Sequence, residues 1–99
     1  ADAILCGSDE IALGVLAVLA QRGVAVPDDI AVAGFDNLDD GMFSTPSLTT
    51  IDPGTSRLAR ATLDLLADRL SGLGDPLPRR VISPAELVRR ESTLGASPS

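Results

Sequence analysis

Four polar residues follow two short apolar runs and are the side chains best placed to bind a ligand. Ser8 and Asp9 come after the first run, and Asp36 and Asn37 come after the second. A carboxylate such as Asp36 can accept two hydrogen bonds from neighbouring hydroxyl groups of a small molecule, and Ser8 is close enough to join it. A plainer alternative carries equal weight: Asp36 begins an Asx turn, and Ser8 caps the following helix.

The elements that must position these residues are two strands and a helix. The runs Ala3–Cys6 and Ile30–Phe35 do not alternate between polar and apolar residues, so we expect strands buried on both faces of a parallel sheet. A helix from Asp9 to about Arg22 joins them as a right-handed crossover. The carboxyl ends of both strands then meet at one edge, where open α/β sheets bind small molecules. The sequence therefore predicts an α/β fold.

The sequence contains no recognisable motif for catalysis, phosphate binding or metal binding. The chain has no histidine, which excludes Ser-His and Cys-His pairs and imidazole metal ligands. Its glycines form neither a P-loop nor a dinucleotide fingerprint. The acidic residues Asp36, Asp39 and Asp40 lack the ligand spacing and closing glutamate of an EF-hand. Cys6 cannot form an internal disulfide and is expected to fill apolar space. We expect no catalytic residue, metal or cofactor.

Composition limits the partners. The formal net charge of −6 argues against a nucleic-acid surface on this chain. No apolar run approaches the length of a membrane span, and no basic-then-apolar leader precedes Ala1. The chain lacks an initiator methionine and opens almost directly on a strand. We therefore expect a segment of a longer protein in a cytoplasmic setting, without a membrane partner.

The first helix is apolar on two sides. One stripe is expected to lie on the sheet and consists of Ile11, Ala12, Val15, Val18 and Leu19. A second stripe is expected on the far side and consists of Leu13, Leu16, Ala17 and Ala20. A helix that covers a sheet is normally polar on its back. Another segment of the chain, or a second copy of the protein, must therefore cover the second stripe.

The sequence from residue 37 onward indicates several short elements. We expect a loop over residues 37–46 that is interrupted by the apolar Phe43. Patterning further predicts a strand over 48–51, a helix over 56–70 capped by Thr55 or Ser56, strands over 80–82 and 87–90, and a disordered tail over 95–99.

Three runs of the sequence carry a resemblance to a known family. The runs AILCGSDEIALGVLAVLAQRGVAVPDDIAVAGFDN, TPSLTTI and ELVRREST resemble the carboxyl-terminal part of the lactose/galactose repressor family of bacterial transcription regulators. They occur in the family's order and at its intervals, from Ala1 to about Thr93. In this family a helix-turn-helix binds operator DNA, and a two-lobed sensor related to periplasmic sugar-binding proteins follows it. The implied fold is a partial periplasmic-binding-protein-like (type I) two-lobed sensor, a parallel sheet with flanking helices.

The resemblance also implies a domain organisation. Residues 1–52 correspond to the carboxyl-terminal lobe of the effector-binding domain, and 53–85 cross into the amino-terminal lobe as a helix and a strand. Residues 86–94 return as a strand, and 95–99 form a disordered tail. The helix-turn-helix and the opposite wall of the effector cleft lie outside the chain, which therefore cannot read an operator itself.

Site residues follow from the same resemblance. The carboxylate of the GFD run, Asp36 here, binds effector hydroxyls, and the residue before the helix aspartate, commonly asparagine but here Ser8, also faces the effector. Asp9 and Asn37 are then supporting or capping residues. The family often continues LTTI with Gln-Pro, whereas this chain has Asp52-Pro53-Gly54. The implied partners are a sugar or related metabolite and a second subunit, bound through Leu13, Leu16, Ala17, Ala20 and Phe43.

Two function classes remain. One is the effector-sensing and dimerisation segment of a sugar-responsive transcription regulator. The other is a fragment of a periplasmic or extracellular sugar-binding protein of a transport system, which shares the fold. The residues of the three runs and the two-sided apolar helix favour the regulator. An enzyme comes a distant third, because no base, nucleophile or metal constellation supports it.

Overall fold

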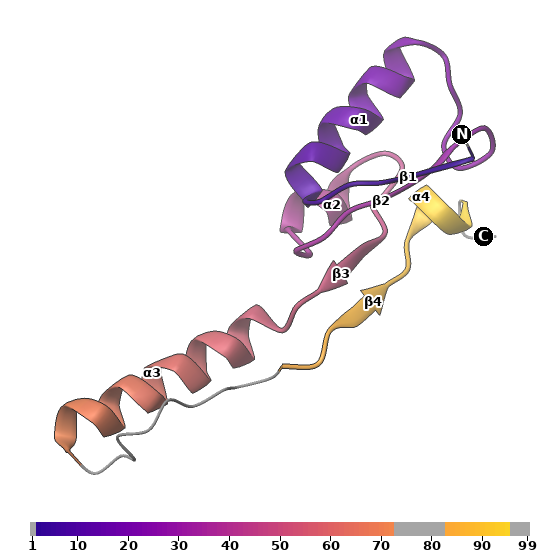
Figure 1. Cartoon of the computed structure of the whole chain (residues 1–99). Coiled ribbons are helices and arrows are strands. Elements are labelled where there is room, and N and C mark those ends of the chain that lie inside the picture. Colours follow the sequence, from indigo (N-terminus) through magenta and orange to yellow (C-terminus); the bar gives the residue numbers. More distant parts are fainter. Residues whose placement is uncertain (1, 73–82, 96–99) are drawn as a thin grey trace.

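A parallel strand pair and one helix form the body of the molecule. In the computed structural model, which describes residues 2–72 and 83–95, β1 (Ala3–Leu5) and β2 (Ala31–Ala33) pair in parallel. The helix α1 (Asp9–Gln21) connects them and lies along the pair (Figure 1). The predicted strand–helix–strand unit and the α/β class are confirmed.

Two further strands and a helix form an extended arm, which consists of residues 50–72 and 83–88. Ala33 forms a parallel bridge with Thr49, and β3 (Thr50–Asp52) continues outward, paired antiparallel with β4 (Glu86–Val88). The helix α3 (Thr55–Ser71) then points away from the body (Figure 1). The chain therefore measures 59 × 27 × 19 Å along its principal axes.

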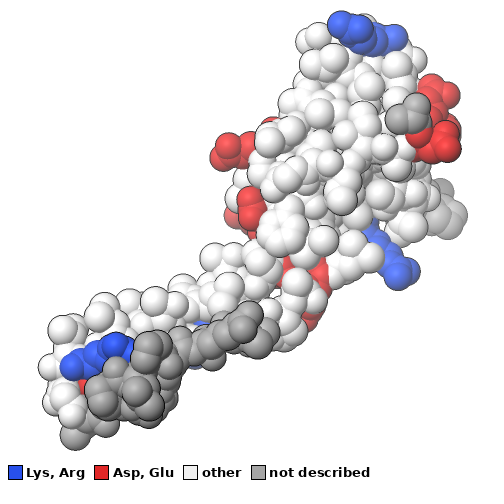
Figure 2. Space-filling view, viewed as in Figure 1, with Lys and Arg blue, Asp and Glu red and all other residues white. Residues whose placement is uncertain are grey.

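The core lies between α1 and the sheet. Its buried members come from α1, from both parallel strands or their ends, and from the residue before the Thr49 bridge; they are Cys6, Ala12, Leu16, Val32 and Leu48. By contrast, α3 contains no buried residue. Figure 2 shows one face on which the surface of the body and arm is mostly uncharged. The apolar sides of α1 and α3 therefore remain partly uncovered in the described part of the chain.

The predicted faces of α1 are partly wrong. Leu16, expected on the outer stripe, is only 6% exposed, whereas Ile11 and Val18, expected on the sheet, are 58% and 47% exposed. The cause is the first residue of the helix. Asp9 turns its carboxylate into the core, and a helical repeat of 3.6 residues places Ala12 and Leu16 on the same face.

Other elements differ from the sequence prediction in detail. The expected loop contains a short helix α2 (Asp39–Phe43), which has two acidic residues in its first turn. The N-cap of α3 is Gly54, with φ +74°, and neither Thr55 nor Ser56 caps that helix. The last part of the expected return strand is instead a one-turn helix α4 (Glu91–Leu94). The strand expected over 80–82 and the tail beyond Gly95 lie outside the described residues.

No helix in the described ranges is both long and apolar enough to cross a membrane.

Candidate functional site

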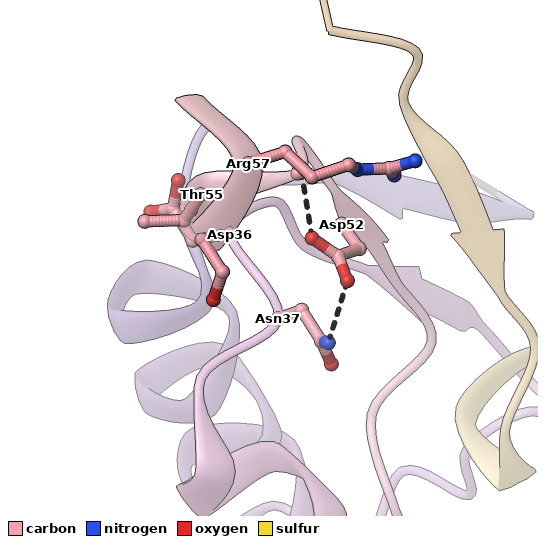
Figure 3. A pocket seen from close by; sticks show the side chains of 7 residues that line it. Asp36, Asn37, Asp52, Thr55 and Arg57 are labelled. Atoms are coloured by element: carbon pink, nitrogen blue, oxygen red, sulfur yellow. Dashed lines mark hydrogen bonds between the residues drawn. The ribbon is translucent and has the colours of Figure 1, made fainter. Parts of the chain in front are cut away.

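An open pocket of about 230 Å³ lies where β2 and β3 end and α3 begins (Figure 3). It combines two carboxylates, an amide, two hydroxyls and a guanidinium, and it is lined by Asp36, Asn37, Asp52, Gly54, Thr55, Ser56 and Arg57. The parallel bridge between Ala33 and Thr49 aligns β2 with β3, so their carboxyl ends lie on the same side, and α3 begins shortly after β3.

Asp36, which is predicted to bind a ligand, lines this pocket and has an unusual backbone conformation. Its φ is +117° and that of Asn37 is +58°, although neither residue is glycine. Non-glycine residues rarely adopt positive φ, and those that do concentrate at functional sites. The Asp36 N–H donates to Ile51 O over 3.0 Å, and its side chain is exposed. No residue in the described ranges donates a hydrogen bond to its carboxylate.

Asn37 lies beside it and forms hydrogen bonds with β3 and with Arg90. Its backbone N–H donates to Thr50 Oγ1 (3.2 Å), and its Nδ2 donates to Asp52 Oδ2 over a long 3.4 Å. Its Oδ1 accepts from Arg90 Nη2 over 3.0 Å. Asn37 therefore lines the pocket and also connects the strand ends around it, which is consistent with the predicted supporting role.

Asp9 is completely buried and does not line the pocket. Its Oδ2 accepts from the Leu38 N–H (2.7 Å), and its Oδ1 accepts from Thr50 Oγ1 (2.6 Å). A methyl group at Gly34 would overlap Asp9 Oδ1, so the close approach of β2 requires glycine there. The Asp9 carboxylate therefore joins separate segments of the chain and does not cap its own helix.

Ser8 is the N-cap of α1. Its Oγ accepts a hydrogen bond of 3.3 Å from the Ile11 N–H, which is the capping alternative derived from the sequence. Ser8 does not line the pocket that contains Asp36. Its predicted contact with a ligand stays a prediction.

Sequence reasoning missed the contribution of the segment after β3. Asp52 lines the pocket, and its Oδ1 accepts from the Gly54 N–H over 2.8 Å. Thr55, Ser56 and Arg57 follow at the start of α3. The available signal was the Asp-Pro-Gly turn directly after a β-prone run, at the sheet edge that carries Asp36.

The ion pair at the pocket, the single cysteine and the acidic residues each bear on reactive or metal-binding chemistry. Arg57 lies 3.8 Å from Glu86, and both side chains are more than half exposed, so this ion pair contributes little. Burial raises the pKa of the Cys6 thiol, which keeps it protonated and unreactive. Within residues 2–72 and 83–95, no three His, Cys, Asp or Glu side chains cluster as metal ligands would.

The residues predicted to form a subunit interface do not share one environment. Phe43 is 80% exposed and both alanines of the outer stripe, Ala17 and Ala20, are exposed. Leu13 is half-buried against the core. Leu16 belongs to the core of this chain and is removed from the predicted interface.

Comparison with known proteins gives consistent matches. A model of the periplasmic binding protein-like domain matches residues 1–93. The HTH-type transcriptional repressor PurR of Histophilus somni (strain 129Pt) is 41% identical over 90 residues, which cover 91% of this chain and 27% of that protein. The chain therefore spans little more than a quarter of this relative.

Two solved structures share the fold and much of the sequence. A LacI-type transcription regulator from Bifidobacterium animalis subsp. lactis has a TM-score of 0.89 and 47% identity over 93% of this chain and 32% of that one. A LacI family regulator from Arthrobacter sp. FB24, solved with lactose, has a TM-score of 0.85 and 38% identity over 93% of this chain and 35% of that one.

These relatives are transcription regulators, which favours a regulator over a transport protein. The chain belongs to the periplasmic binding protein-like domain family, in the form found in the sensor domains of LacI-type transcription regulators.

Proposed function

We propose that this chain is the effector-sensing segment of a sugar-responsive transcription regulator and that the effector binds beside Asp36. The exposed Asp36 carboxylate carries the proposal. It lines an open pocket at the carboxyl end of a parallel strand and has a backbone conformation that non-glycine residues rarely adopt. The lactose bound by the Arthrobacter relative supports a sugar as the class of ligand.

The pocket has the chemistry to bind a polyhydroxy molecule. An ionised carboxylate accepts hydrogen bonds from two neighbouring hydroxyls, and each such charge-assisted bond contributes about 1.5–3 kcal/mol. Asp52 supplies a second carboxylate, and the hydroxyls of Thr55 and Ser56 both donate and accept. A sugar presents such hydroxyls around its ring, so several of these contacts can form at once.

The domain organisation of the proposal follows the two connections between body and arm. Residues 1–52 form part of one lobe, residues 53–85 cross into a second lobe, and residues 86–94 return. The antiparallel pairing of β3 with β4 supports this assignment, since both crossings then run side by side. A helix-turn-helix and the second wall of the cleft are assigned to regions outside this chain, in a cytoplasmic protein without catalytic activity.

A homodimer is part of the same proposal. The interface is assigned to Leu13, Ala17 and Ala20 of α1 together with Phe43 of α2. Small side chains allow close approach of a second helix, and Phe43 offers a large exposed apolar surface. Operator DNA is then a partner only through the helix-turn-helix of each subunit.

Titration of the full-length regulator tests the assignment of the effector site. A panel of sugars that includes lactose is screened by thermal shift, and binding is then measured by calorimetry for wild type and Asp36→Asn. We expect the variant to bind at least about tenfold more weakly, because it loses charge-assisted acceptors, and to fold normally.

Asp40→Asn is the matched control, because Asp40 is an exposed acid of the neighbouring helix that does not line the pocket. Equal affinity of wild type and Asp36→Asn would remove Asp36 from the site. A wild-type protein that binds no sugar of the panel would contradict the class of effector.

A further inference from the structure

We propose that Asp9 and Thr50 act together as positioning residues that hold Asp36 in the conformation needed to bind the effector. The inference rests on the proposed function, because it assigns a role toward the Asp36 site. Neither residue lines the pocket, and both are completely buried. Thr50 was not singled out from the sequence, since it looked like an ordinary residue of a β-prone run.

The two amides that follow Asp36 are both held by this pair. The Asn37 N–H donates to Thr50 Oγ1 over 3.2 Å, and the Leu38 N–H donates to Asp9 Oδ2 over 2.7 Å. The orientation of Asp36 depends on the backbone that follows it. Two consecutive anchored amides therefore fix the turn in which Asp36 and Asn37 have positive φ.

The Thr50 hydroxyl links Asp9 to the turn, because it donates one hydrogen bond and accepts another. The single hydroxyl proton of Thr50 is donated to Asp9 Oδ1 over 2.6 Å. The Thr50 oxygen is then left to accept from the Asn37 N–H. Removing the Thr50 hydroxyl would leave the Asn37 amide and one buried Asp9 oxygen without their partners, and both changes act on the Asp36 turn.

Asp9 itself is held from several sides. Its backbone N–H donates to Phe35 O over 2.8 Å. Asp9 is also the first residue of α1, where the partial positive charge of the helix favours a carboxylate. Gly34 leaves just enough room for its Oδ1. The pair is therefore a rigid support for the turn. Removing its hydrogen bonds should weaken effector binding more than an equally destabilising change elsewhere in the core does.

Ser92 offers a matched control in the same fold. Its hydroxyl is also completely buried, donates to Val32 O (2.6 Å) and accepts from the Thr49 N–H (2.8 Å). Its hydroxyl therefore forms as many hydrogen bonds as that of Thr50, but none of them is with residues 36–38. Ser92→Ala should lower stability much as Thr50→Val does, without loosening the turn.

The test compares Thr50→Val, Thr50→Ser and Ser92→Ala in the full-length regulator. Amide hydrogen exchange is measured over residues 36–38, and lactose is used as the binding probe in calorimetry, well below every melting temperature. We expect Thr50→Val to speed exchange in this segment and to weaken lactose binding about tenfold, which corresponds to the net loss of about one hydrogen bond. Thr50→Ser should restore both properties, and Ser92→Ala should change neither.

Unchanged exchange over residues 36–38 in Thr50→Val would overturn the proposal, as would equal effects of Thr50→Val and Ser92→Ala on binding. Asp9→Asn, which keeps the size of the side chain but has one acceptor fewer, is expected to behave like Thr50→Val. If the wild type does not bind lactose, the proposed effector is at fault, and hydrogen exchange still decides whether the pair positions the turn.

Discussion

Arg90 Nη2 donates a hydrogen bond of 3.0 Å to Asn37 Oδ1, across 53 residues of sequence. The other terminal nitrogen of the same guanidinium, Nη1, donates to Leu48 O over 3.1 Å. One planar side chain therefore joins the segment after β4 to the pocket and to the residue before the Thr49 bridge. Arginine is suited to this role because its fork holds two donors in a fixed geometry.

The first prediction concerns this fork. Arg90→Lys retains the charge but not the two separated donors, so we expect it to lose the bond to Asn37 or the bond to Leu48. The expected cost is about 1 kcal/mol of unfolding free energy, because the site is only partly buried. Chemical denaturation of the full-length protein measures it.

Arg89→Lys is the matched control, because Arg89 is the exposed neighbour. Its unfolding free energy should stay within about 0.5 kcal/mol of the wild type, as is usual for surface substitutions. If the two lysine variants unfold alike, the guanidinium of Arg90 has no special role.

A second prediction separates the two roles considered for Ser8. Ser8→Ala removes the cap of α1, so the free energy of unfolding should fall by about 0.5–2 kcal/mol. If capping is the only role of Ser8, effector affinity should stay within about twofold of the wild type. Ser8→Asp preserves the cap and should restore stability. A tenfold weaker affinity in both variants would instead establish Ser8 as an effector contact.

The third prediction contrasts neighbouring residues of α1. Leu16→Ala opens a cavity in the core and should lower the free energy of unfolding by about 2–5 kcal/mol, with the dimer retained. Ala17→Glu places a charge on the exposed face, where a twofold interface would meet it twice, and should shift the full-length protein from dimer to monomer. Sedimentation velocity measures the oligomeric state.

Gln21→Glu, an exposed position at the end of the same helix, is the control for added charge. A dimer that survives Ala17→Glu would move the interface away from this face of α1. A monomer produced by Gln21→Glu as well would point to net charge as the cause.

The local pattern of the sequence was enough for the strand–helix–strand unit and for the position of Asp36 at the end of the second strand. Apolar runs of strand length on either side of a helix indicate a parallel crossover, and a residue that follows the second run must lie at the carboxyl edge of the sheet. The cap at Ser8 was also readable, since capping acts over three residues. These inferences depend only on neighbours along the chain.

The tertiary structure decided which side of α1 faces inward and which polar groups support the site. Both stripes of α1 are apolar, so hydrophobicity could not choose between them, and the choice followed from the buried carboxylate of Asp9. Its partners Leu38 and Thr50 lie 29 and 41 residues away in sequence. Such bonds form only after separate segments pack together, because burial removes the competing water that would otherwise satisfy each group.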